Sequence, residues 1–173
     1  NLIADILRDS FGIDLLLMGS GAIRSYSLGP VVHYADLVEC LPYDDAVYML
    51  KVTGAQLERM LRHVLRDEAF QGEHTEFYQF SHGMHIVWSR STQTFRTLTL
   101  DGEPLYADRL YTVAMQKYHY NNLQACLSIT PEEAEKNGKI RVLSTSARDV
   151  VEEYLMVNQH LNRRVEGRLV VED

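Results

Sequence analysis

The residues with the clearest chemical potential follow a short apolar run near the start of the chain. Residues 13–18 are typical of a buried strand, which ends at Gly19 and is followed by Gly21 and Arg24. Glycine lets the backbone turn sharply and lets a ligand approach closely, because it has no Cβ. Arginine offers a planar fork of donors that suits a phosphate or a carboxylate. The spacing indicates an anion site at a strand end, where α/β folds place ligands, although a plain turn with a surface arginine fits the same residues.

The histidines do not form a metal-binding pattern. Seven of them are scattered along the chain, and only His82 and His85 are close together. A separation of three residues on a strand places two side chains on opposite faces, so we expect a half-buried strand pair. A two-metal hydrolase site needs several His, Asp and Asn ligands around ions about 3.5–4 Å apart. We therefore expect no metal site within this chain.

Composition and charge exclude several classes of protein. The 173 residues, 46% apolar and 24% charged, suit a single globular domain that spans residues 1–173. A net charge of −7 argues against nucleic-acid binding, which needs a basic surface. No apolar run approaches the roughly 20 residues of a membrane span. Cys40 and Cys126 form no C-x-x-C motif and are expected to pack rather than to pair.

The beginning of the chain resembles an internal segment. Asn1 runs straight into apolar residues at positions 2, 3, 6 and 7, which is helical spacing, with no initiator methionine and no targeting segment. We therefore expect a fragment cut at a domain boundary. For such a fragment, the lack of a signal peptide says nothing about where the full protein is located.

Helices and strands alternate along the chain without a linker. Helices are expected at residues 1–11, at 34–41 before Pro42, after the capping residue Thr53, after Thr130 and at 146–159. Strands are expected at residues 13–18, 46–52, near 78–89, 95–100, 110–117 and 164–171, with a loop at 68–76 and a hairpin turn at Asp101-Gly102. This mixture of helices and hairpins predicts an α+β domain with a mixed β-sheet and packed helices.

Six short motifs, taken in order, resemble those of one known family. They are Asn-Leu-Ile-Ala-Asp at 1–5, Gly-x-Gly-x-Ile-Arg at 19–24, Leu-Pro-Tyr at 41–43, Val-Thr-Gly-Ala-Gln-Leu at 52–57, Tyr-Gln-Phe-Ser at 78–81 and Glu-Gly-Arg-Leu at 166–169. Together they resemble the C-terminal domain of the 5′-nucleotidase family, which includes UDP-sugar hydrolases and cyclic-nucleotide phosphodiesterases. Each motif is a few common residues, and the specificity lies in their order and spacing.

The resemblance implies a function that is divided between two domains. In that family the C-terminal domain binds the nucleoside part of the substrate. A separate N-terminal metallophosphatase domain holds two divalent metal ions and the hydrolytic machinery. The resemblance thus implies a nucleotide or nucleoside substrate and the chain's own N-terminal domain as partners. It implies no catalytic residue and no cofactor within these 173 residues, and a secreted, periplasmic or cell-surface location.

The resemblance also assigns residues to the binding site. The arginine of the family's glycine-rich turn matches Arg24, which would bind phosphate through charge-assisted hydrogen bonds. The family's Leu-Pro-Phe-Gly-Asn pattern stands here at residues 41–45. Its aromatic residue, which stacks on the base, matches Tyr43, and its asparagine, which reads the base edge, matches Asp45. The second aromatic wall matches Tyr118.

Three departures from the family pattern affect this assignment. The turn at residues 19–21 reads Gly-Ser-Gly where the family usually has Asn-Gly-Gly. An ionised Asp45 only accepts hydrogen bonds, which favours a base edge rich in amino donors. The family's Gly-Gly-Asp-Gly-Tyr loop, whose aspartate holds the ribose, is replaced by residues 122–126. Gln124 falls at the aspartate position, and Asn121 and Asn122 are the other polar candidates for the ribose contact.

Two other functions fit the sequence. The chain could be a binding module that retains the fold but has lost nucleotide recognition, since the ribose loop is missing. It could instead be a free-standing enzyme that uses Asp44 and Asp45 as an acid–base pair. Adjacent side chains diverge unless a turn brings them together, and no nucleophile–base arrangement is evident in the sequence.

Overall fold

The computed structural model describes residues 1–71 and 76–173 and contains two mixed sheets. The larger sheet has the strand order β3-β1-β7-β2-β8, with bounds β1 (Leu15–Gly19), β2 (Val47–Thr53), β3 (Tyr78–Phe80), β7 (Leu110–Gln116) and β8 (Arg141–Ser144). The smaller sheet has the order β6-β5-β4-β9, with bounds β4 (Met84–Ser89), β5 (Thr94–Leu100), β6 (Glu103–Pro104) and β9 (Leu169–Glu172). The pairs β1–β7 and β4–β9 are parallel and the others are antiparallel. The predicted α+β class is confirmed, with two mixed sheets rather than one.

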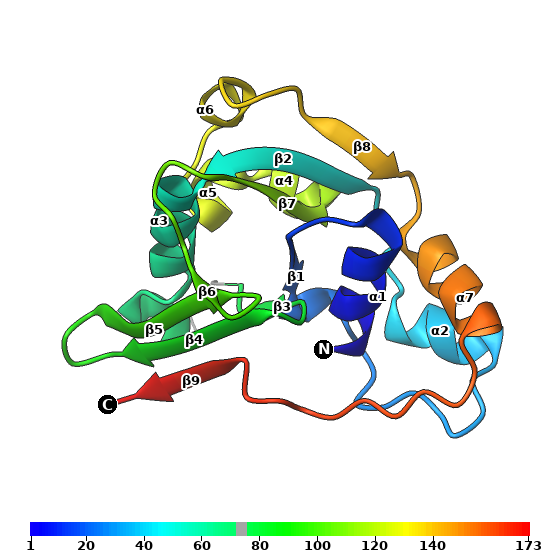
Figure 1. The fold of residues 1–173 in the computed structure, drawn as a ribbon. Coiled ribbons are helices and arrows are strands. Elements are labelled where there is room, and N and C mark those ends of the chain that lie inside the picture. The colour runs from blue at the N-terminus through cyan, green and yellow to red at the C-terminus, as the bar shows by residue number, and fades with distance from the viewer. Residues whose placement is uncertain (72–75) are drawn as a thin grey trace.

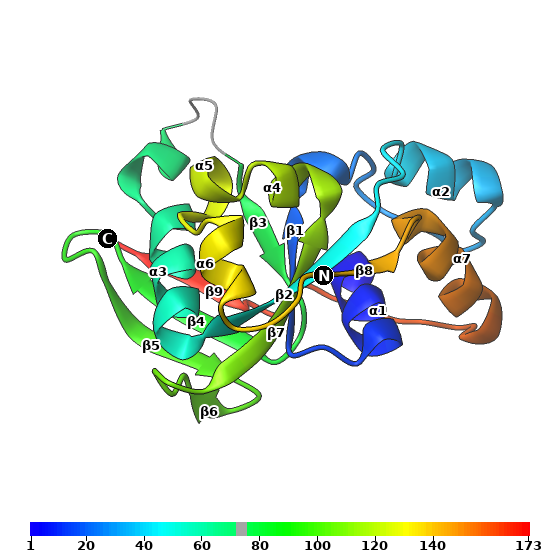
Figure 2. The same ribbon diagram turned by 90° about the horizontal axis from the view of Figure 1, so that it is seen from above.

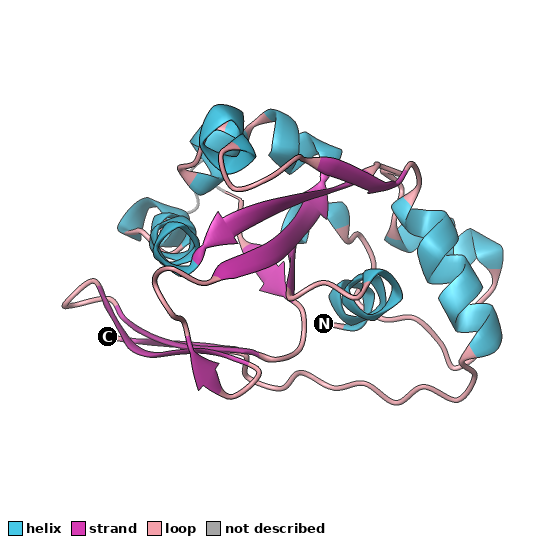
Figure 3. Ribbon diagram, turned by 45° about the horizontal axis from the view of Figure 1, so that its top comes forward, coloured by secondary structure: helices cyan, strands magenta, loops and turns pink. Residues whose placement is uncertain are grey.

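Helices cover both faces of the larger sheet (Figures 1 and 2). On one side lie α1 (Leu2–Phe11), α2 (Tyr34–Cys40) and α7 (Ala147–Val157). On the other side lie α3 (Gly54–Val64), α5 (Leu123–Leu127) and α6 (Pro131–Glu135). Three shorter segments complete the fold: η1 (Ser20–Ala22), η2 (Asp67–Phe70) and α4 (Lys117–Asn121). Figure 3 shows the smaller sheet beside α3, on the same side of the larger sheet. No helix in the described part of the chain is long and apolar enough to cross a membrane.

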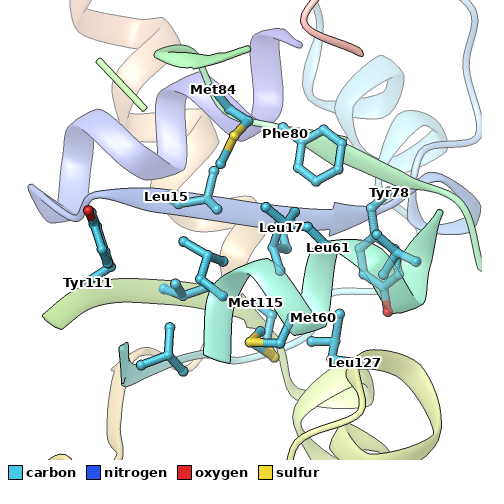
Figure 4. Packing of buried hydrophobic residues seen from close by; sticks show 14 of the residues in the cluster. Leu15, Leu17, Met60, Leu61, Tyr78, Phe80, Met84, Tyr111, Met115 and Leu127 are labelled. Carbon is cyan, nitrogen blue, oxygen red and sulfur yellow. The ribbon is translucent and has the colours of Figure 1, made fainter. Parts of the chain in front are cut away.

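Strand β1 illustrates why the sheet needs two covered faces. Successive side chains of a strand point to opposite faces. Leu15 and Leu17 join the core that β1 shares with α3 and the smaller sheet, whereas Leu16 and Met18 join the core beneath α1 and α2. Figure 4 shows the first of these cores. An uninterrupted apolar run is what a strand buried on both faces requires.

Local sequence signals fix the boundaries of several elements. Helix α3 begins with a capping box, in which the Thr53 hydroxyl accepts from Gln56 N at 3.2 Å and Thr53 N donates to Gln56 Oε1 at 2.8 Å. The turn between β5 and β6 places Asp101 and Gly102 at φ 52° and 82°, which is typical of a two-residue hairpin turn. The expected cap and hairpin are both confirmed.

Two regions of secondary structure were not expected, and two expectations about secondary structure were wrong. Residues 117–127 form α4 and α5, which are too short to show a helical period in the sequence. Strand β8 was not expected, because it is an edge strand of four residues with no clear alternation. Strand β9 begins at Leu169 rather than at residue 164. His82 lies in the turn between β3 and β4, so it does not form the expected strand pair with the exposed His85.

A buried ion pair connects the start of the chain to its end. Both oxygens of Asp5, on α1, accept from Arg168, next to β9, at 2.6 and 2.7 Å. Asp5 is 1% exposed and also accepts from His82 N at 2.7 Å. Arg168 further donates to Phe80 O at 2.8 Å and to Glu166 Oε2 at 2.8 Å. These bonds hold α1, the β3–β4 turn and the C-terminal strand together.

Candidate functional site

Four segments of the chain converge at one edge of the larger sheet. The parallel strands β1 and β7 both end at this edge. The antiparallel strands β2 and β3 both begin there. A pocket of about 480 Å³ opens at this edge and is lined by Gly21, Ala22, Arg24, Tyr43, Asp44, Asp45, Glu76, Gln116, Tyr118 and His119. Ligands of open α/β sheets bind at such carboxyl ends of parallel strands.

Arg24 and Tyr43 form one side of the pocket. The Arg24 backbone N–H donates to Cys40 O at 2.8 Å, which fixes the turn after η1 against α2. The guanidinium lies over the Tyr43 ring, 5.4 Å from its centroid, and donates to the ring hydroxyl at 3.5 Å. A cation above an aromatic face is attracted by the ring quadrupole. The arginine is thus positioned at the rim while it remains exposed.

The segment that carries Tyr43 is clamped by the N-terminus of α7. Ser146 Oγ donates to the Asp44 carboxylate at 2.8 Å, and Arg148 N donates to Asp44 Oδ1 at 3.2 Å. The Arg148 guanidinium donates to Leu41 O at 3.1 Å and to Pro42 O at 3.2 Å. The Asp44 carboxylate is therefore engaged in holding the loop.

Asp45 links the two aromatic sides. Its Oδ2 accepts from Tyr118 N at 2.9 Å, and its backbone carbonyl accepts from Ala147 N at 3.1 Å. The carboxylates of Asp44 and Asp45 are thus bonded to different elements, α7 and α4. This arrangement argues against the acid–base pair that the sequence allowed.

The floor of the pocket contains Glu76 and His119. Glu76 Oε1 accepts from Gly21 N at 2.8 Å. His119 is 3% exposed, and its Nδ1 lies 3.0 Å from the Tyr78 hydroxyl. Burial lowers the pKa of His119, although the charges of Glu76 and Asp45 oppose this shift. Burial also raises the pKa of Tyr78. The imidazole at the floor is therefore neutral at pH 7.

The structure brings together four of the seven residues that the sequence suggested for the nucleotide site. Arg24, Tyr43, Asp45 and Tyr118 line the same pocket. Asn122 and Gln124 do not line it. Asn122 Nδ2 donates to Tyr118 O at 2.8 Å, and Gln124 is an exposed residue of α5. Asn121, the third polar candidate, is exposed at the end of α4.

Sequence reasoning missed three lining residues. Glu76 lies in a stretch that is typical of a loop, Gln116 ends a strand, and His119 is one of several scattered histidines. No local signal marks any of them, because they meet only when β3 and β7 pair with β1. Across residues 1–71 and 76–173, no group of three or more His, Cys, Asp or Glu side chains is placed to hold a metal ion.

Gly19 leaves no room for a side chain at the pocket floor. A Cβ there would lie 2.6 Å from both Glu76 Oε1 and His119 Cε1. We expect Gly19→Ala to lower the free energy of unfolding by about 1–3 kcal/mol, because the buried His119 ring cannot move away easily. Chemical denaturation measures this loss.

Gly21→Ala is the matched control for that variant. A Cβ at Gly21 would lie 3.3 Å from the flexible end of Glu76, its nearest neighbour. We expect a cost of less than about 1 kcal/mol for this substitution. Equal losses from the two variants would contradict the close packing at Gly19.

Comparison with known proteins identifies relatives of the whole fold. The family model for the 5′-nucleotidase C-terminal domain matches residues 1–125. The 5′-nucleotidase precursor of Thermus thermophilus has the same fold, with a TM-score of 0.76 and 18% identity over 99% of this chain and 34% of that chain. No curated protein sequence matches this chain.

Two further solved structures are similar at low sequence identity. The NAD nucleotidase of Haemophilus influenzae has a TM-score of 0.72 and 14% identity, over 98% of this chain and 32% of that chain. The sulfate thiohydrolase SoxB of Thermus thermophilus has a TM-score of 0.71 and 18% identity, over 98% of this chain and 31% of that chain. The chain thus spans about a third of the length of each structure.

Proposed function

The chain belongs to the family of 5′-nucleotidase C-terminal domains, and from that premise we propose that it is the nucleotide-binding domain of a metal-dependent phosphoesterase. In this proposal a metallophosphatase domain elsewhere in the full protein holds two divalent metal ions and carries out hydrolysis. This chain binds the nucleotide and presents its phosphate. The isolated 173 residues are then inactive as a hydrolase.

One observation carries the proposal: two uncovered tyrosine rings belong to one pocket. Tyr43 is 58% exposed and Tyr118 is 60% exposed, although hydrogen bonds hold the backbone segments that carry them. Large aromatic rings are usually buried, so a pair left exposed around a pocket favours ligand binding. Stacking on a base contributes roughly 1–3 kcal/mol for each base and tolerates different bases.

The positions of the charges indicate how a nucleotide would lie in the pocket. Arg24 lies at the rim beside Tyr43, where its guanidinium can bind a phosphate bidentately. The described residues that line the floor offer carboxylates and a neutral imidazole instead. A nucleotide would therefore place its base between the tyrosines and its phosphate at Arg24. Two of the similar structures are a 5′-nucleotidase precursor and an NAD nucleotidase, which agrees with a ligand of this class.

The helices α4 and α5 favour a second candidate function. They occupy residues 117–127, where the resemblance implies a glycine-rich ribose loop, and Gln124 lies outside the pocket lining. A domain without a ribose contact could serve as an interaction module that has kept the fold. Such a module would bind no nucleotide.

Calorimetric titration with nucleoside monophosphates distinguishes the two functions. We expect this chain to bind them and Arg24→Met to weaken that binding about 5- to 30-fold, because one charge-assisted contact is lost. Binding of the corresponding nucleoside, which has no phosphate, should change little. Arg141→Met, on the exposed strand β8, is the matched control. Lack of binding to the unmodified chain would instead favour the interaction module.

A further inference from the structure

Glu76 presents an open carboxylate at the floor of the pocket. One hydrogen bond, from Gly21 N at 2.8 Å to Oε1, fixes its position beside the end of β1. An ionised carboxylate has about four acceptor sites on its two oxygens. Among residues 1–71 and 76–173, no other residue donates a hydrogen bond to Glu76, whose side chain lines the pocket.

Gln116 adds an amide side chain to the lining of the same pocket. It is 5% exposed. Its side-chain amide makes no hydrogen bond to another residue in the described part of the chain. A ligand in the pocket can therefore reach this amide. The amide offers two donors and one acceptor carbonyl.

The charges at the floor select the kind of group that enters. Glu76 and Asp45 are both acceptors there, and Asp44 is already engaged by Ser146. A phosphate would be repelled from these carboxylates. A ring edge that carries N–H donors would be attracted, and such hydrogen bonds to a charged acceptor are the strong ones.

The proposed nucleotide function underlies the next step: we propose that Glu76 determines specificity by selecting a purine with two adjacent N–H donors on its edge, as in guanine. The N1–H and the 2-amino group of guanine match the two oxygens of one carboxylate. The neighbouring O6 can accept from the Gln116 amide. Tyr43 and Tyr118 supply the stacking that any base would gain, so the discrimination comes from the floor.

Other purines fit this floor less well, because they lack one or both of these N–H donors. Hypoxanthine keeps N1–H and O6 but lacks the 2-amino group, so it loses one hydrogen bond to Glu76. Adenine presents a lone pair at N1, which would face the carboxylate and repel it. Sites that hydrogen-bond a substrate N–H reject analogues that lack it, because their own polar groups are then left unpaired.

Calorimetric titration with GMP and IMP tests the proposal, because the two nucleotides differ only in the 2-amino group. We expect the unmodified chain to bind GMP roughly 10- to 100-fold more tightly than IMP, since one charge-assisted hydrogen bond is lost. Glu76→Gln should bring the ratio of the two affinities below about threefold. Glu39→Gln, an exposed substitution on α2, should leave the ratio unchanged.

The outcomes separate this proposal from the function on which it rests. Binding of both nucleotides with equal affinity to the unmodified chain would overturn the role of Glu76 and leave nucleotide binding intact. A GMP preference that survives in Glu76→Gln would also overturn it. Failure of both nucleotides to bind would overturn both proposals. A melting curve checks that the Glu76→Gln variant is folded. The comparison of GMP with IMP binding to the unmodified chain tests the proposal without depending on any variant.

Discussion

Replacing Arg168 by methionine is expected to lower the free energy of unfolding by about 3–5 kcal/mol. The substitution leaves the Asp5 carboxylate, which is 1% exposed, without its charged partner. A buried charge without a charged partner is costly because it has lost its hydration and no opposite charge compensates for that loss. Phe80 O and Glu166 would lose hydrogen bonds from the same guanidinium.

Chemical denaturation of three variants tests this expectation. Arg96→Met is the control, because Arg96 and Glu172 form a pair at 3.1 Å whose side chains are 60% and 41% exposed. Exposed pairs contribute less than about 1 kcal/mol. The double variant Asp5→Leu with Arg168→Met should be more stable than Arg168→Met alone, since it removes the stranded charge. Similar losses from Arg168→Met and Arg96→Met would show that the buried pair is unimportant.

The ion pair between Asp5 and Arg168 should contribute to the stability of the fold at every accessible pH above neutrality. Burial alone would lower the pKa of Arg168, but hydrogen bonds to Asp5 and Glu166 raise the pKa above its ordinary value. A raised pKa gives stability that is present below the unfolded value and is lost only as pH rises through the folded value. Both values lie far above neutrality, so the guanidinium stays charged.

Removing both aromatic rings from the pocket is expected to weaken nucleotide binding. The binding free energy should become less favourable by roughly 2–6 kcal/mol in total. Tyr43→Ala and Tyr118→Ala would each remove one stacking surface, and each single variant should show part of the loss. Because both rings are more than half exposed, the variants should unfold at nearly the same temperature as the unmodified chain.

Tyr26→Ala is the matched control for the double tyrosine variant. Tyr26 is fully exposed and does not line the pocket, so its removal should leave the affinity for GMP unchanged. Calorimetric titration measures the affinity and circular dichroism follows the melting temperature. Unchanged binding in the double variant would show that the ligand does not stack between these rings.

Elements with a strong local signal could be predicted from the sequence. The apolar run of β1 and the Thr53 cap of α3 are examples, because each depends on residues that are adjacent in the chain. The family resemblance went further. It selected Arg24, Tyr43, Asp45 and Tyr118, which are up to 94 positions apart, and the structure places all four around one pocket.

Features that depend on distant pairing could not be predicted. Asp5 and Arg168 are separated by 163 positions, and nothing near either residue indicates its partner. Glu76 enters the pocket only because β3 runs antiparallel to β1. Asp45 matched a base-reading position, but one of its oxygens is bonded to Tyr118 N, which only the folded chain reveals.

The clamp between α7 and the loop at residues 41–45 has an evolutionary consequence. The matched family region ends at residue 125, yet Ser146 and Arg148 lie beyond it and hold the loop that carries Tyr43. Under the proposed function, selection on nucleotide binding should therefore extend into this later part of the chain. Among descendants of the same ancestor, changes at Asp44 should be accompanied by changes at Ser146. The segment that shapes the pocket is then longer than the region that the family model matches.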